Sequence, residues 1–276
     1  MPAVEKHLRV SKKIETDDLD WDLAAEIGLT EEERTILTYF GDIEGQTVYY
    51  LREVLNTKPA RNPELLAFLT IWNYEEFYHS RAIATLLDVC GESGSMERQS
   101  DVRASAQFAA KFEEVVQTMI SKLLPKTFLS LWMAWGASQE LLTLRGYEQL
   151  SRQTKNPVLA ELCRRIAKQE RRHFAYYFNG AAERLEGHRF QQRFVRFLFE
   201  KFWTPVGGGV KSEKQIAEMV AGLFPGDELE TVMANFDAKL GALPGMHGFA
   251  VGRAYAAKIR PHAAQLPAGS ELLLSA

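Results

Sequence analysis

Residues 168–173, KQERRH, and residues 74–79, YEEFYH, share the short motif Glu-x-x-His, which ends at His173 in one segment and at His79 in the other. In an α-helix, residues three apart lie on one face, so a carboxylate and an imidazole project together and can bind one metal ion. A lone match to so short a motif is a weak signal. The position of each match within its helix therefore matters.

Four helix-start signals precede glutamates at matching distances: Asn-Pro pairs at residues 62–63 and 156–157, a capping box of Thr30 with Glu33, and Pro125. The glutamates that follow these signals by 14 or 15 residues are Glu44, Glu76, Glu140 and Glu170. At about 1.5 Å per residue, each carboxylate lies roughly 21 Å into its helix. In an antiparallel bundle of long helices, the four would meet near mid-height.

The resulting order is Glu, Glu-x-x-His, Glu, Glu-x-x-His, which is the ligand pattern of two-metal carboxylate sites in ferritin-like bundles. We assign one histidine to each metal, two bridging glutamates and two terminal glutamates: His79 and His173, Glu76 and Glu170, Glu44 and Glu140. Oxygen and nitrogen ligands without thiolate favour iron or manganese over an iron–sulfur cluster or a closed structural zinc site. The alternative, ion pairs or surface residues, requires four carboxylates at one depth by accident.

Apolar residues at helical spacing predict four long helices, over about residues 31–55, 63–89, 125–153 and 157–185. The candidate glutamates interrupt these apolar stripes, as Glu44 does in the first helix. A buried carboxylate without a partner is costly, so the glutamates need cations nearby.

Three residues near the motifs are poorer ligand candidates or allow more than one interpretation. Asp42 lies off the apolar stripe and is a poorer ligand candidate than Glu44. Glu75 points away from the ligands and is expected to be solvated or to lie behind them. Gly136, one turn before Glu140, leaves room either for a small molecule or for close helix packing.

The rest of the chain is predicted to be helical but without a ligand pattern. Residues 101–124 would form the crossover between two helical hairpins. Residues 1–20 are polar and predict a loose arm, whereas residues 190–276 predict added C-terminal helices, with an aromatic-rich segment that is core or dimer contact. We therefore expect a single all-α domain over residues 1–276, a ferritin-like long-helix bundle whose core spans about residues 30–186.

Composition excludes several classes of protein. The net charge of −3 carries no nucleic-acid signature. Only two cysteines occur, Cys90 and Cys163, which is no disulfide framework and favours a reducing cytoplasm. Residues 1–10 lack a signal-peptide pattern, and the most apolar stretch, residues 128–137, is too short to span a bilayer. The expected protein is cytoplasmic, with no membrane span.

The motifs resemble those of the soluble acyl-(acyl carrier protein) desaturases. Residues 166–173, IAKQERRH, and 75–79, EEFYH, are similar to that family's two Glu-x-x-His helices, and residues 139–143, QELLT, to its lone-glutamate helix. The likeness covers roughly residues 30–205. In the family, the threonine of the third segment, here Thr143, lies beside the di-iron centre and takes part in handling activated O2.

Two residues depart from the family pattern. Gln169 stands where the family usually has aspartate, and Tyr78 stands where a basic residue usually precedes the histidine. Both positions belong to the network behind the ligands that orients them and delivers electrons. Tyr78 is either a redox-active phenol or a packing residue.

The resemblance implies an O2-activating di-iron oxidoreductase that holds two iron ions, with manganese as the other candidate metal. Its substrate would be an acyl chain on acyl carrier protein, from which it removes hydrogen at an unactivated C–H bond. An external electron donor and a homodimeric state are expected. The helix over residues 157–185 carries cations that are either a solvated face or a docking surface for the acidic carrier: Arg164, Arg165, Lys168, Arg171 and Arg172.

Two other functions fit the same ligand pattern. A ferritin-like di-iron oxygenase could hydroxylate, N-oxygenate or deformylate a small molecule, because pocket shape selects among these outcomes. A ferritin-like iron-binding protein is the non-enzymatic reading, but the crossover and C-terminal helices argue against it.

Overall fold

The computed structural model describes residues 3–55, 57, 61–92, 94–95, 97–98, 124–208 and 211–263. Within these residues every regular element is a helix, apart from one isolated bridge between Gly208 and Lys211. The all-α prediction is therefore confirmed. The predicted crossover helix at residues 101–124 lies outside the described part except for its last residue. No helix of the described chain combines the length and apolar character needed to cross a membrane.

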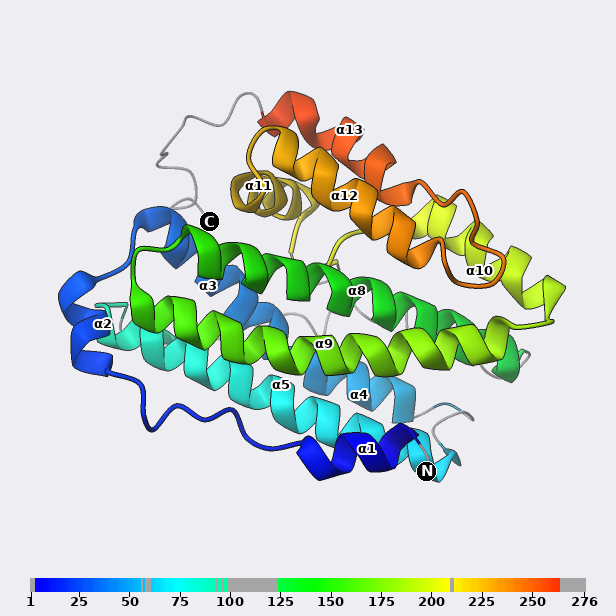
Figure 1. Ribbon diagram of the computed structural model, residues 1–276, viewed down its shortest axis with the longest axis horizontal. Helices are drawn as coiled ribbons and strands as arrows, with labels where there is room; N and C mark the ends of the chain where they lie inside the picture. The colour runs from blue at the N-terminus through cyan, green and yellow to red at the C-terminus, as the bar shows by residue number, and fades with distance from the viewer. Residues whose placement is uncertain are drawn as a thin grey trace.

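Three long helices have the bounds that the sequence predicts, because the signals that start them are local: an Asn cap followed by Pro in two of them and Pro125 in the third. They are α5 (Pro63–Val89), α8 (Pro125–Gln153) and α9 (Pro157–Leu185). Asn62 and Asn156 each accept two hydrogen bonds from backbone N–H groups of the first turn, at 3.0–3.2 Å. Figure 1 shows α8 and α9 running side by side as a hairpin, with α5 along α9.

The predicted helix over residues 31–55 is instead two helices, α3 (Glu31–Glu44) and α4 (Thr47–Leu55), so that prediction is wrong. The backbone turns at Gly45, and the Thr47 hydroxyl donates to the carbonyl of Glu44 at 2.9 Å, which ends the first helix. The buried face continues across the turn at helical spacing, from Phe40 and Glu44 to Thr47 and Val54, whereas Val48 is 45% exposed.

The N-terminal residues are not a loose arm. They form α1 (Ala3–Val10) and α2 (Trp21–Ile27), and α1 packs against α5 and α9. Val4, Ile14 and Leu19 are buried in the hydrophobic core. In Figure 1 this segment runs along the outer edge of α5. Ile14 and Leu19 are spaced too widely to form a helical stripe. They anchor the stretch between α1 and α2 on the bundle.

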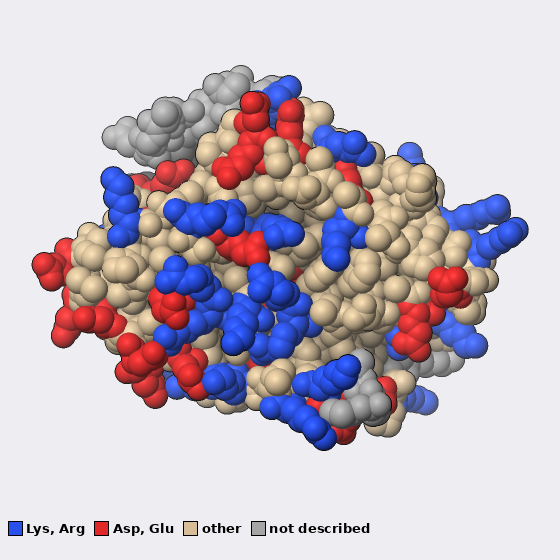
Figure 2. All heavy atoms as spheres, viewed as in Figure 1, with Lys and Arg blue, Asp and Glu red and all other residues tan. Residues whose placement is uncertain are grey.

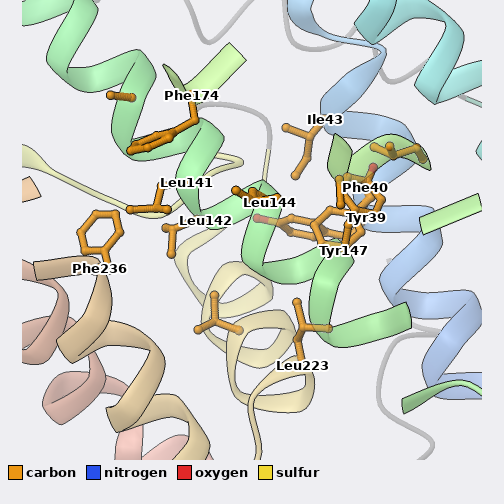
Figure 3. Close-up of a cluster of buried hydrophobic side chains, with 14 of the residues drawn as sticks. Tyr39, Phe40, Ile43, Leu141, Leu142, Leu144, Tyr147, Phe174, Leu223 and Phe236 are labelled. Carbon is orange, nitrogen blue, oxygen red and sulfur yellow. The ribbon is translucent and has the colours of Figure 1, made fainter. Parts of the chain in front are cut away.

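The C-terminal part is helical, as predicted, and forms α10 (Arg189–Phe202), α11 (Glu213–Leu223), α12 (Asp227–Leu240) and α13 (Val251–Ala263). Both α11 and α12 pack on α8, on the side away from α5 in Figure 1. Figure 3 shows Tyr147 of α8 between Phe40 of α3 and Leu223 of α11, with Leu141 and Leu142 of the same helix toward Phe236 of α12. This added layer closes one side of α8, the helix that carries Glu140.

Candidate metal centre

All six predicted ligands meet inside the bundle. They form two overlapping groups, each with its ligand atoms within 4.8 Å of one another: Glu44, Glu76, His79 and Glu170, and Glu76, Glu140, Glu170 and His173. Glu76 and Glu170 belong to both groups. The sequence predicted this division, with one histidine per group and these two glutamates shared. Buried Glu/His clusters of this kind can hold metal ions.

Each ligand is sealed from solvent by the packing of its helix. The six side chains come from α3, α5, α8 and α9, and none exposes more than 6% of its surface. Groups that would be charged at neutral pH are therefore gathered where water cannot solvate them, which is unfavourable unless cations compensate.

The inner atoms of the cluster face one another without hydrogen-bonding. His79 Nδ1 lies 3.0 Å from Glu170 Oε1, and His173 Nδ1 lies 2.9 Å from Glu76 Oε1. Nevertheless both Nδ1 atoms, both Glu170 oxygens and Glu76 Oε1 are buried without a hydrogen-bond partner among the described residues. Buried polar atoms are rarely left unpaired. Atoms aimed at a shared space, with oxygen and nitrogen donors only, fit a pair of divalent cations such as iron or manganese.

The outer nitrogen of each histidine is held by a hydrogen bond. His79 Nε2 lies 2.7 Å from Gln169 Oε1, and His173 Nε2 lies 2.7 Å from Glu75 Oε2. Metal-binding histidines commonly donate their second N–H in this way, which orients the ring and leaves the other nitrogen free for the ion. Both rings are thus oriented to bind through Nδ1.

The two terminal carboxylates are held by hydrogen bonds as well. Tyr147 donates from its hydroxyl to Glu44 Oε1 at 2.7 Å, and Trp72 donates from Nε1 to Glu140 Oε1 at 2.8 Å. Both donors are buried. Each terminal glutamate therefore keeps its other oxygen, Oε2, on the side of the histidines, since Glu44 Oε2 and Glu140 Oε2 lie 3.8 and 3.5 Å from their respective Nδ1 atoms.

The carboxylates make both imidazoles strong bases. Burial alone would lower the pKa of His79, but Glu170 and Glu44 outweigh burial and raise it to about 10. Burial also disfavours a charged His173, yet its contacts with Glu140 and Glu170 raise its pKa well above the ordinary value of 6.5.

The direction of each carboxylate's pKa shift depends on its neighbours. Burial, followed by repulsion from Glu170, raises the pKa of Glu76 and of Glu140 well above the usual range. Burial would also raise the pKa of Glu170, but its two imidazole neighbours reverse the shift and lower it. Protons thus occupy the cluster when no ion does, and a bound cation would replace them.

A third group of potential ligands lies behind His173. Its atoms come from His7, Glu75 and His173, and the His7 ring stacks on the His173 ring at 5.7 Å between centroids. Arg172 donates to Glu75 Oε1 at 2.7 Å. Because a guanidinium already compensates this carboxylate, a further cation is disfavoured, and we interpret the group as support for His173.

For three neighbouring residues, the observed contacts agree with one of the readings that the sequence allows. Glu75 is fully buried and bonds His173, so it lies behind the ligands and is not solvated. Asp42 is buried but takes no part in the cluster, since Arg98 and Lys211 compensate its charge at 2.6–2.8 Å. Gly136 provides close packing, because a Cβ there would lie 2.5 Å from the ring of Tyr177.

Thr143 and Tyr78 make contacts away from the ligands. The Thr143 hydroxyl donates to the Gln139 carbonyl of its own helix at 3.1 Å. Tyr78 is half-buried, packs near Phe77, and lies beneath the ammonium of Lys13 at 5.6 Å. These contacts favour the packing role of Tyr78, whereas the role of Thr143 in oxygen chemistry stays a prediction.

Sequence reasoning did not identify the residues that hold the ligands from outside. Trp72 lies four residues before Glu76 and Tyr147 seven after Glu140, so each shares a helical stripe with a candidate ligand. Their buried polar groups, which require partners, were the available signal. His7 had no such signal, because it lies alone in a polar segment.

A cleft of about 780 Å³ lies between α10, α11 and α13, with Trp203, Ile216 and Tyr255 in its walls. None of the six candidate ligands lines it. No protein-family model, no curated protein and no solved structure matches the chain. The assignment of the cluster therefore depends on its own geometry.

Proposed function

We propose that this protein is an O2-dependent di-iron oxidase, of the desaturase or oxygenase type, in a ferritin-like bundle. The observation that carries the proposal is the pair of four-residue groups that share Glu76 and Glu170 and leave their inner nitrogen and oxygen atoms unpartnered. When bound there, two iron ions supply the reduction of O2 and the oxidation of a C–H bond.

The protein's own residues would position the two ions and keep water away from them. Glu76 and Glu170 would contact both ions, while His79 and His173 would each hold one through Nδ1. Tyr147 and Trp72 restrain the two terminal carboxylates. Because the cluster is buried, water has little access, and side reactions of an oxidising centre are suppressed.

The proposed substrate is an acyl chain presented by acyl carrier protein. Figure 2 shows Lys and Arg side chains gathered over the first half of α9, which fits an acidic carrier. Part of this charge is already compensated, since Arg171 pairs with Glu148 and Arg172 pairs with Glu75. Lys168 is exposed and has no ion-pair partner among the described residues. Because much of the positive charge on α9 is already paired, the second candidate function is oxygenation of a small molecule that needs no carrier.

Metal content and oxygen uptake test the first part of the proposal. Protein purified from its own host, or reconstituted with Fe²⁺ without air, should hold two ions per chain and consume O2 when reduced. Glu76→Ala and His79→Ala should lose metal, whereas Glu213→Ala, an exposed glutamate of α11, serves as the control. Full metal occupancy after loss of Glu76 would refute the site.

The carrier is tested by reversing charge on α9. Lys168→Glu with Arg171→Glu should raise the KM for carrier-bound acyl chain severalfold, and added salt should have a similar effect, because exposed charges mainly act on association. Lys214→Glu, on α11 and equally exposed to solvent, is the matched control. Indifference to both charge reversal and salt would leave the small-molecule substrate as the remaining candidate.

A further inference from the structure

The N-terminal segment contacts the residues around the candidate centre through the backbone N–H and C=O of Lys12, in addition to the ring of His7. Residues 7–18, here called the clasp, cross the outer side of α5 and α9. Within the clasp, the backbone N–H of Lys12 donates to Glu75 Oε1 at 3.3 Å. The backbone carbonyl of Lys12 accepts from Gln169 Nε2 at 2.9 Å. Glu75 and Gln169 are the two residues that bond the outer nitrogens of the histidines.

The Lys12 carbonyl determines how Gln169 is oriented. A carbonyl can only accept, so the amide must turn its NH₂ toward Lys12 and its oxygen toward His79. An amide oxygen can only accept as well, so His79 must carry its proton on Nε2. When an ion replaces the second proton, Nδ1, which faces Glu170, is then the nitrogen that binds it.

Glu75 acts in the same way on the other histidine. Its Oε1 accepts from the Lys12 N–H and from Arg172, and both donors favour an ionised carboxylate. Its Oε2 is consequently an acceptor, which places the second proton of His173 on Nε2 and leaves Nδ1 toward the cluster.

The clasp is fastened to α9 by Arg165. Its guanidinium binds both carboxylate oxygens of Asp18, at 2.5 and 2.8 Å, and the Glu15 carbonyl at 2.8 Å. Ile14 and Leu19 bury their side chains on either side of this contact. Two-point Arg–carboxylate bonds are strong and directional, so this one fixes the clasp relative to the helix that carries Gln169.

We propose that the clasp, fastened by Arg165, is a positioning element that sets the tautomer of both metal-binding histidines through the backbone of Lys12. The proposal rests on the metal centre proposed above. It predicts that a contact outside the cluster, made by a residue that binds no metal, controls the affinity for both ions together. Residues behind the ligands commonly contribute ten- to a hundredfold to metal affinity.

The test compares full-length Arg165→Glu with wild type in competition titrations with Co²⁺ against a chromogenic chelator. Like charges at residues 165 and 18 should release the clasp, weaken both Co²⁺ sites about tenfold and speed amide hydrogen exchange at Lys12. Arg196→Glu is the matched control, because Arg196 also joins a carboxylate, Glu200, to a distant carbonyl, that of His247, yet it lies on α10.

Restoring the pair with opposite charges should reverse the effect. Arg165→Glu combined with Asp18→Arg is expected to regain most of the Co²⁺ affinity and the slow Lys12 exchange. In Zn²⁺-loaded wild type, nitrogen NMR should find the proton of both histidines on Nε2. Should Arg165→Glu fail to fold, Arg165→Gln removes the charge without repulsion.

The possible outcomes distinguish a failure of the clasp proposal from a failure of the proposed metal centre. Co²⁺ affinity within twofold of wild type in the Arg165 variants, whatever the exchange rate at Lys12, would overturn the clasp proposal. A proton on Nδ1 in the Zn²⁺-loaded protein would overturn it too. A wild-type protein that binds no Co²⁺ would instead refute the metal centre itself.

Discussion

Removing the Tyr147 hydroxyl should weaken one of the two metal sites and spare the other. Tyr147 is fully buried, and its hydroxyl donates to Glu44 Oε1 at 2.7 Å. Glu44 belongs to the group with His79 but not to the group with His173. Tyr147→Phe keeps the ring packed against Phe40, whose centroid lies 4.6 Å away, so the change is confined to the hydrogen bond.

The magnitude follows from the character of that bond. A hydrogen bond to a charged group contributes about 1.5–3 kcal/mol, and leaving the carboxylate oxygen without it in a buried site has a comparable cost. Since about 1.4 kcal/mol corresponds to tenfold in affinity, the ion beside His79 should bind about ten- to a hundredfold more weakly. The ion beside His173 should change by less than about threefold.

Trp72→Phe is the mirror experiment, because Trp72 donates to Glu140 in the other group. Two-step Co²⁺ titrations followed by absorbance should show the weaker step associated with His79 in one variant and with His173 in the other. His79→Ala and His173→Ala identify which step belongs to which site. If both variants weaken the same step, or neither weakens any, the assignment of terminal carboxylates to separate ions is wrong.

Four further outcomes are expected. Glu170→Ala should remove both ions, because Glu170 belongs to both groups; metal analysis that finds two ions would contradict this. Thr143→Val should keep two ions, but a smaller fraction of the O2 consumed should yield product. If that fraction is unchanged, Thr143 has only a packing role. Gly136→Ala should lower the free energy of unfolding by about 1–3 kcal/mol in denaturant titrations, since its Cβ meets a ring at 2.5 Å, whereas Gly222→Ala, with its nearest atom at 3.7 Å, should not. Cys163 is fully buried, and burial raises its pKa, so iodoacetamide should leave it unmodified in folded protein at neutral pH, as mass spectrometry can check.

Helix bounds were predictable wherever a local signal defines them. Asn62 and Asn156 cap α5 and α9 with their own side chains, so each start depends on residues within one turn. The break after Glu44 was missed because the apolar ladder continues through it. Gly45 and Thr47 were the local signals, yet glycine and threonine also occur in unbroken helices.

The buried face of each helix was predictable for a similar reason. A period of 3.6 residues shows which side chains share a face, so the four glutamates and two histidines could be identified as inward-facing. Equal depth from each cap then brought them to one level. The same spacing continues from Glu44 to Thr47 and Val54 of α4, which are buried, whereas Val48 is 45% exposed.

Periodicity and caps within single helices therefore sufficed to identify the candidate ligands and their division into two groups. The contacts that hold those ligands come from distant parts of the chain. Gln169 donates from its side-chain Nε2 to the backbone carbonyl of Lys12, and His7 stacks on His173, although the sequence of residues 1–20 predicts only a polar arm. A helical period specifies which face of a helix turns inward. It does not specify which residue from a distant part of the chain packs against that face. Long-range packing alone fixes that residue, and with it the orientation of both imidazoles.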